Sequence, residues 1–361
     1  MGRPVTILGA GVGGLTAGIA LARRGFEVTV VERAESVGSR YRGDLQGLEN
    51  WTSSQDVLEM LGEMGIPIAF EHDAVRECIQ YDSRLRAYPL RSDRVAFYLV
   101  RRGPAEGTLD SALRTAAVSA GVRIVFGVKS FTGAADIVAT GPRAPYLVAV
   151  GINFRTSLEP AALGILDGAI APRGYAYLLA SRGRGTLAVI GTGGQADLKS
   201  YLEKAVSRFR QVLSFDVVDP APFGGIGSRF TGLGSGVPRV GEAGGFQDAM
   251  WGFGIRMAFQ TGYLAARAIT EGGDYWRLAA ASVVPFCRST VVNRLFYNLL
   301  GDGATRLLLL GLAHAKDPVA FMNRVYRESL PKRWLFPLAS RSLGGRRGRP
   351  QREPEPEQLT P

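Results

Sequence analysis

Cysteine and histidine are scarce in this chain. Its 361 residues include two of each: Cys78, Cys287, His72 and His314. Two cysteines cannot build a disulfide framework and two histidines cannot build a histidine-rich metal site, so we expect no bound metal. We expect the segment 71–73, Glu-His-Asp, to be an ordinary surface turn. Neither histidine lies near a nucleophile-elbow sequence, so a Ser-His-Asp hydrolase is unsupported. The sequence indicates no particular catalytic side chain, and we expect a bound cofactor to supply the chemistry.

Long uninterrupted apolar runs are also absent. The longest near the C-terminus, Leu307 to Ala313, is far shorter than the ~20 residues that a membrane span needs. The N-terminal run from Val5 to Ala22 contains spaced glycines, and an acidic residue follows at position 32. This pattern fits a nucleotide site better than a signal peptide. We therefore expect a cytoplasmic protein with no segment across a bilayer.

Acidic residues are fewer than basic ones, with 32 Asp and Glu against 43 Lys and Arg, which gives a net charge of +11. Residues 285–361 carry much of the excess, with thirteen basic and six acidic residues. A basic region of this kind suits an anionic membrane surface, here the inner face, with Trp334 and Phe336 at the interface, and no nucleic acid is expected. A core-packing helix pair with solvated arginines explains the same pattern equally well.

The apolar segments, in a chain that is 46% hydrophobic, indicate an α/β fold that starts with a βαβ unit. Predicted strands lie at 5–8, 26–31, 122–126 and 135–139, with antiparallel strands over 75–100 and through most of 145–235. Predicted helices lie at 15–24, 45–70, 109–120, 198–213, 253–270 and 285–335. The β-rich insert interrupts the nucleotide-binding unit, so its segments are discontinuous.

The first strand is followed by a glycine-rich turn, Gly9-Ala10-Gly11-Val12-Gly13-Gly14, which opens a helix. Gly9 permits the tight turn, Gly11 lets the backbone approach a pyrophosphate, and Gly14 allows close packing of helix on strand. Glu32 ends the second strand, where its carboxylate can accept hydrogen bonds from ribose hydroxyls. Strand, helix, strand and acid in register predict a dinucleotide-binding site.

FAD and NAD share this first motif, and a second glycine-rich stretch indicates which of them binds. Residues 240–246 read Val-Gly-Glu-Ala-Gly-Gly-Phe, and residues 252–255 read Gly-Phe-Gly-Ile before a helix. This stretch resembles the second FAD motif of glutathione-reductase-like flavoproteins, in the branch of geranylgeranyl reductases and para-hydroxybenzoate hydroxylase-type monooxygenases. The resemblance implies FAD as the cofactor, with an acid on the ribityl chain (Glu242 here, usually Asp) and a helix N-terminus at the flavin. The FAD contacts that it implies here are Gly241, Glu242, Ala243, Gly252, Gly254 and Ile255.

Further segments match the same branch, and the resemblance covers residues 4–270. Arg40 lies where the branch has a basic residue after the ribose-binding acid, and Arg102 precedes a helix as in the family. Residues 136–141, Asp-Ile-Val-Ala-Thr-Gly, resemble the strand that runs back to FAD, which adds Thr140 and Gly141 to the contacts. Arg33, beside Glu32, is the last predicted contact. No second dinucleotide motif is complete, since no further glycine or acid follows Gly191-Thr192-Gly193-Gly194 in the required pattern. We therefore expect no separate NAD(P)H domain. Electrons are expected to come from NAD(P)H that docks transiently or from a protein donor.

The expected fold is therefore α/β: a Rossmann-like FAD-binding domain with an interleaved antiparallel β-sheet substrate domain and C-terminal helices. The FAD-binding domain is assigned to residues 1–75, 101–141 and 236–275, and the substrate domain to 76–100 and 142–235. A helical region at 276–340 and a disordered tail at 341–361 complete the division.

The substrate side is predicted from aromatic residues. Residues 172–178, Pro-Arg-Gly-Tyr-Ala-Tyr-Leu, resemble the strand that lines the substrate pocket in geranylgeranyl reductases, which places Tyr175 and Tyr177 there. Trp51 and Trp251 are expected to add apolar wall, although all four side chains fit core packing as well. Arg42-Gly43-Asp44 stands where many archaeal members carry a Cys-Gly pair facing the flavin, so that cysteine is missing.

The resemblance implies an FAD-dependent oxidoreductase that reduces carbon–carbon double bonds of a hydrophobic isoprenoid or lipid-linked substrate. A first alternative is an FAD-dependent monooxygenase that hydroxylates a hydrophobic substrate. A second is a non-redox flavoprotein that binds an isoprenoid.

Overall fold

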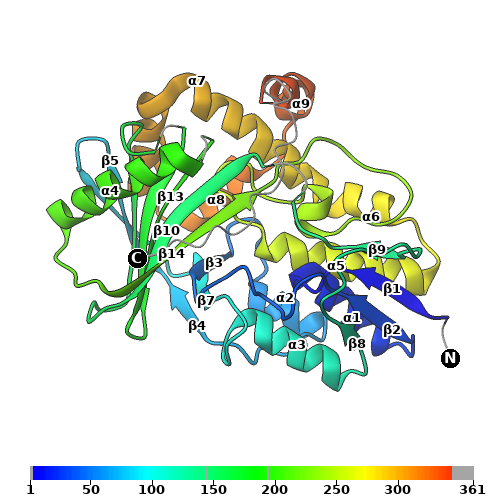
Figure 1. Cartoon of the computed structure of the whole chain (residues 1–361). Coiled ribbons are helices and arrows are strands. Elements are labelled where there is room, and N and C mark those ends of the chain that lie inside the picture. Colours follow the sequence, from blue (N-terminus) through cyan, green and yellow to red (C-terminus); the bar gives the residue numbers. More distant parts are fainter. Residues whose placement is uncertain (1–2, 143–144, 172, 193–194, 344–361) are drawn as a thin grey trace.

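The computed structural model describes residues 3–142, 145–171, 173–192 and 195–343. Three β-sheets organise this part of the chain, and the first is a parallel sheet of four strands in the order β8-β2-β1-β9 (Figure 1). Its strands are β1 (Val5–Leu8), β2 (Val28–Val31), β8 (Arg123–Val125) and β9 (Ile137–Val138).

Helix α1 (Val12–Ala22) joins β1 to β2 and completes the predicted βαβ unit. It packs against α3 (Leu109–Ser119) and α5 (Ile255–Glu271). Gly14 allows the turn after β1 to lie close to this helix, because a Cβ added there would be 2.0 Å from the backbone oxygen of Gly9. The turn after β1 is therefore pressed directly against the first turn of the helix.

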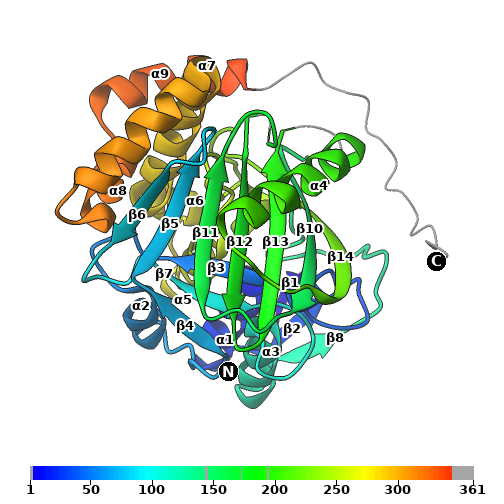
Figure 2. The ribbon, with the colours of Figure 1, turned by 90° about the vertical axis from the view of Figure 1, so that its left-hand side faces the viewer.

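The second sheet has seven strands in the order β14-β10-β13-β12-β11-β5-β6. Neighbouring strands are antiparallel except for β11 and β5, which are parallel. Helix α4 (Gln195–Val212) covers one face (Figure 2), where Phe209 is fully buried against the sheet. The strands are β5 (Glu77–Asp82), β6 (Ala87–Arg91), β10 (Leu147–Arg155), β11 (Ala161–Leu166), β12 (Tyr175–Ser181), β13 (Arg184–Gly191) and β14 (Val218–Gly227). The predicted α/β fold class, with a parallel sheet and an antiparallel sheet, is confirmed.

A third sheet corrects the helix predicted over 45–70. It has the order β3-β7-β4, with strands β3 (Leu45–Glu49), β7 (Phe97–Arg101) and β4 (His72–Val75). Residues 45–49 pair with β7, so only α2 (Val57–Glu63) is helical in the predicted range. The helix begins there because Asp56 caps it by accepting a hydrogen bond from the backbone N–H of Leu58 at 2.8 Å. The strands of this sheet come from both predicted domains. The sheet therefore does not test the predicted domain boundaries, which remain a prediction.

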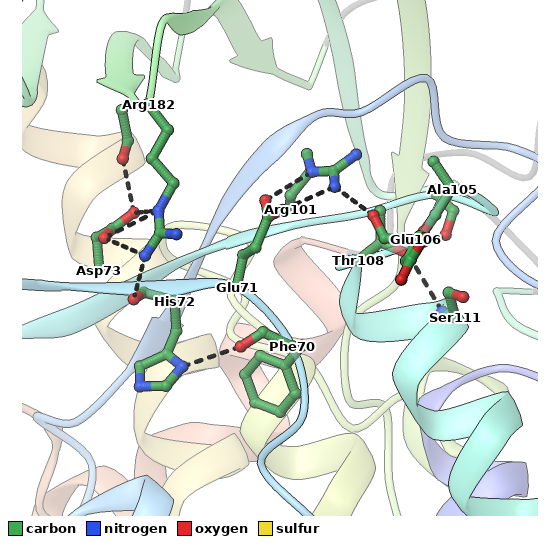
Figure 3. Close-up of polar contacts among 12 residues, drawn as sticks. Phe70, Glu71, His72, Asp73, Arg101, Ala105, Glu106, Thr108, Ser111 and Arg182 are labelled. Carbon is green, nitrogen blue, oxygen red and sulfur yellow. Dashed lines mark hydrogen bonds and ion pairs between the residues drawn. The ribbon is translucent and has the colours of Figure 1, made fainter.

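The segment around His72 is part of this sheet (Figure 3). His72 begins β4, so the prediction of a surface turn was wrong. The carboxylate of Glu71 accepts hydrogen bonds from Arg101 at 3.0 and 3.1 Å, and that of Asp73 accepts hydrogen bonds from Arg182 at 2.8, 2.9 and 3.2 Å. The second pair joins β4 to the turn between β12 and β13. Across the described ranges, no group of three or more His, Cys, Asp or Glu is placed to hold a metal ion.

Four helices end the described chain: α6 (Tyr275–Ser282), α7 (Val284–His314), α8 (Pro318–Tyr326) and α9 (Leu330–Ser342). Helix α7 is interrupted at Gly301, whose φ of +54° lies outside the helical region. The predicted disordered tail begins at 341, but α9 continues to Ser342, and residues 344–361 lie outside the described part of the chain. Among the described helices, none is long and apolar enough to cross a membrane.

Candidate active site

A cavity of about 1770 Å³ is lined by the four-stranded sheet, the seven-stranded sheet, α7 and α8. Most of the predicted site residues line it, although they come from distant parts of the sequence. On the nucleotide side they are Gly9, Gly11, Glu32, Arg33, Arg40, Arg102, Thr140, Gly141, Gly241, Glu242, Gly252, Gly254 and Ile255. On the substrate side they are Trp51, Tyr175, Tyr177 and Trp251.

Two predicted FAD contacts do not line the cavity. Gly14 lies behind the glycine turn, where its missing side chain allows α1 to contact Gly9. Ala243 is buried in the short helix η1 (Gly241–Gly244). Both residues therefore shape the backbone of the wall and offer no side chain to a ligand.

Two helix N-termini face the cavity without a side-chain cap. The N-cap of α1 is Gly11 and that of α5 is Gly254, and neither start has an acidic residue in its first turn. Helix N-termini carry free N–H groups and a partial positive charge, so each favours an anionic or carbonyl oxygen. A Cβ added at Gly11 would meet no atom within 4 Å. This open space is the cradle that a pyrophosphate needs.

Glu32 is fixed at the edge of this cradle. Its carboxylate accepts hydrogen bonds from the backbone N–H groups of Ala10 at 2.7 Å and Ala34 at 2.9 Å. These bonds tie the end of β2 to the glycine turn. A carboxylate held in this way can still accept hydrogen bonds from ribose hydroxyls, since each oxygen has two lone pairs.

The next part of the wall is a stack of two arginines on one tyrosine. The guanidinium carbons of Arg40 and Arg102 lie 4.7 and 4.2 Å from the ring centroid of Tyr41. Arg40 also lies 3.4 Å from the Glu242 carboxylate, and Arg102 forms a two-point ion pair with Asp110 at 2.8 and 2.9 Å. The stack fixes both cations on the cavity wall. Sequence reasoning missed Tyr41, which no motif marks.

The seven-stranded sheet contributes an aromatic wall. The Tyr175 hydroxyl donates a hydrogen bond of 2.6 Å to the backbone oxygen of Trp251, and their rings lie edge to face with centroids 5.3 Å apart. The Tyr177 ring lies 6.1 Å from that of Tyr175. Burial raises the pKa of both phenols, so they stay neutral. Pro172, at the start of the predicted motif, lies outside the described residues, as do Gly193 and Gly194.

Trp51 belongs to a second aromatic group on the side of β3 and β7. Its ring packs edge to face on Phe253 at 4.6 Å and on Phe97 at 6.3 Å. Its indole N–H is buried and has no hydrogen-bond partner in the described part of the chain. The Trp51 side chain therefore packs against neighbouring aromatic rings and also lines the cavity.

An apolar arm of the cavity was not predicted. It is formed by Leu308, Leu309 and Leu312 of α7 together with Val319 and Met322 of α8. From the sequence, we expected the basic region 285–361, which contains this segment, either to lie on a membrane surface or to pack as a helix pair in the core. Instead, the run 307–310 divides, because Leu307 is exposed while Leu308 and Leu309 face the cavity.

Asp44 is a second unpredicted feature of the wall. Its side chain is buried at the cavity, and one carboxylate oxygen accepts hydrogen bonds from the Arg42 backbone N–H at 2.9 Å and from the Asn153 amide at 2.7 Å. Thr186 donates to the Asn153 carbonyl at 2.7 Å. Asp44 belongs to the segment 42–44, which stands where many archaeal geranylgeranyl reductases carry a Cys-Gly pair.

Comparisons with known sequences agree with the nucleotide side of the site. The family model described as an NAD(P)-binding Rossmann-like domain matches residues 7–45. A curated L-amino acid oxidase from Bothrops pictus is 34% identical over 96 residues, which is 26% of this chain and 18% of the oxidase. The match therefore spans less than a fifth of that relative's length.

Comparisons with solved structures cover nearly the whole chain. A geranylgeranyl bacteriochlorophyll reductase-like protein from Thermoplasma acidophilum has a TM-score of 0.70 at 18% identity, over 92% of this chain and 99% of that protein. The myxobacterial chondrochloren halogenase, described as a variant of FAD-dependent halogenases, has a TM-score of 0.58 at 17% identity, over 94% and 97%. The chain therefore has the fold of the FAD-dependent oxidoreductases.

Proposed function

We propose that this protein, with its fold of the FAD-dependent oxidoreductases, binds FAD and reduces carbon–carbon double bonds of a hydrophobic isoprenoid or lipid-linked substrate. One observation carries the proposal: the same cavity is lined by the uncapped helix start at Gly11, where a pyrophosphate fits, and by a wall of aromatic and aliphatic side chains. The cradle suits a dinucleotide, and the wall suits an alkene.

The residues that would hold FAD are those already on the nucleotide side. The N-terminus of α1 would bind the pyrophosphate, and Glu32 would bind the adenosine ribose. Glu242 and Arg40 would contact the ribityl chain, and the N-terminus of α5 would lie at the flavin. When bound and reduced, the flavin supplies a hydride. NAD(P)H docking transiently, or a protein donor, would reduce it.

The substrate wall would orient the alkene and exclude water. The Tyr175 hydroxyl is already bonded to Trp251, so this side of the cavity presents mainly ring carbon. The arm lined by Leu308, Leu309 and Leu312 extends the apolar surface for a long chain. Such a site favours reaction because it holds the double bond in place and removes competing water.

A monooxygenase is the second candidate. Asp44 lines the cavity, and the Asn153 amide, which accepts a hydrogen bond from Thr186, holds its carboxylate in place. A carboxylate on the wall suits a substrate that carries a polar atom, as a hydroxylation substrate often does. The two candidates differ in their use of oxygen. Consumption of NADPH that requires both substrate and oxygen favours the monooxygenase.

The aromatic wall gives a direct test of the substrate side. We expect Tyr177→Ala to lower alkene reduction by at least about tenfold while FAD content is unchanged, because loss of the ring lets the alkene move and water enter. Tyr177→Phe is the matched control and should retain most of the activity, since it keeps the ring. Turnover and the flavin absorbance of each purified variant are measured together. Unchanged turnover in Tyr177→Ala would place the substrate elsewhere.

A further inference from the structure

The most exposed large apolar side chains of the described chain lie on two helices, α7 and α9, which pack against each other. Six of them are between 61% and 78% exposed, whereas no other exposed large apolar side chain in the described ranges exceeds 55%. They are Leu299, Leu300 and Leu307 on α7, and Leu330, Trp334 and Leu338 on α9. Figures 1 and 2 both show α7 and α9 at the top of the molecule. We call these six residues the apolar face.

Helix α9 is apolar on its outer side. Leu330, Trp334 and Leu338 follow one another at intervals of four residues, so they lie along one side of the helix. On another side Ala339 is buried, and the Phe336 ring packs on Phe230 with centroids 5.8 Å apart. A helix that exposes leucine and tryptophan while its other side is already packed has an unpartnered apolar surface.

Positive charge accompanies the apolar face. Residues 285–343 hold nine basic and three acidic residues. Arg306, Arg333 and Arg341 are exposed and form no ion pair with the described residues, and each lies close in sequence to a member of the face. Two copies of this surface would repel one another, whereas an anionic lipid surface would attract it.

One member of the apolar face, Leu307, is next in sequence to residues that line the cavity. Leu307 is 71% exposed, while its neighbours Leu308 and Leu309 line the apolar arm. The helix is interrupted just before this segment, at Gly301. A single segment of α7 therefore has lipid-compatible surface on its outside and cavity wall on its inside.

We propose that the apolar face inserts into the interface of an anionic membrane and that the substrate enters the cavity from the lipid beside Leu307. Leucine and tryptophan would lie among the acyl chains, and the arginines would contact the headgroup phosphates. The first part stands on the surface alone. The second rests on the proposed function, because it requires a hydrophobic substrate.

Vesicle binding by the full chain tests the first part. The probes are vesicles of phosphatidylcholine alone and vesicles with added phosphatidylglycerol. We expect binding to the anionic vesicles that falls steeply with salt, and a loss of at least about tenfold in the variant L330Q/W334Q/L338Q. The control variant V118Q/L233Q/V237Q changes three exposed apolar residues elsewhere and should bind like the wild type. Thermal unfolding checks that both variants are folded.

Three results would overturn the proposed membrane binding: no binding to either kind of vesicle, equal binding to both, or equal losses of vesicle binding in the two triple variants. A dimer in light scattering that L330Q/W334Q/L338Q dissociates would also overturn it, in favour of a second copy as the partner. Substrate entry is tested by turnover. The variant should lose turnover of substrate held in vesicles and keep turnover of substrate in detergent micelles, and equal loss in both would contradict entry from lipid. If the wild type turns over neither, the proposed function fails while vesicle binding still stands.

Discussion

Replacing Gly11 with valine is expected to give a folded protein that binds no FAD. A Cβ at Gly11 meets no protein atom within 4 Å, and the backbone there is extended, with φ −79° and ψ 179°, a conformation that valine adopts readily. The new side chain would instead occupy the space of the pyrophosphate at the start of α1. The loss should therefore fall on the ligand and leave folding intact.

Two variants make this result specific. Gly62→Val also adds a side chain in open space, on α2, and should keep FAD. Gly14→Val should disturb folding itself, because its Cβ would lie 2.0 Å from the Gly9 oxygen. Flavin absorbance after purification, and titration with FAD, measure the outcome. Normal FAD content in Gly11→Val would mean that the cofactor does not lie at the N-terminus of α1.

The second large effect is expected at the buried ion pair under the arginine stack. Arg102 and Asp110 are 5% and 2% exposed. Burial alone would raise the pKa of Asp110, but the Arg102 guanidinium, together with the Gly103 N–H and the charge of Arg40, outweighs burial and holds that pKa below its usual value. Arg102→Met leaves the carboxylate buried without its cation and should lower the free energy of unfolding by about 3–5 kcal/mol.

The pH dependence and a neighbouring residue test the cause. In the variant, burial raises the pKa of Asp110 above its unfolded value, so protonation at lower pH relieves the penalty, and the loss of stability should be smaller near pH 5 than near pH 8. Arg101→Met is the matched control, since its partner Glu71 is 37% exposed and can be solvated when unpaired. The free energies of unfolding of the wild type, Arg102→Met and Arg101→Met are measured by urea unfolding near pH 5 and near pH 8. Equal losses in both variants, independent of pH, would contradict this account.

The nucleotide half of the site could be predicted because its signals are local. Gly9, Gly11 and Glu32 follow adjacent strands of one βαβ unit, and the fold brings such residues together by its own geometry. The stretch that contains Gly241 and Gly254 is also contiguous, and it lines the same cavity. Short motifs with a defined backbone role thus predict position well.

The substrate half was harder, because distant contacts decide it. Residues 45–49 have no clear strand pattern, and they form β3 because they pair with β7. Asp44, on the cavity wall, is held in part by Asn153, which is 109 residues away in the sequence. The run 307–310 contains four leucines in a row, so its pattern could not show which side faces the cavity and which faces outward.

The most direct test of the proposed function is the mass of the product made without oxygen. The purified protein, with its FAD reduced by dithionite, is kept anaerobic with a geranylgeranyl lipid, and Gly11→Val is treated in the same way. We predict a product heavier by two hydrogens for each double bond reduced, and none from the variant. No product without oxygen, together with a product heavier by one oxygen in air, would contradict the reductase and establish the monooxygenase.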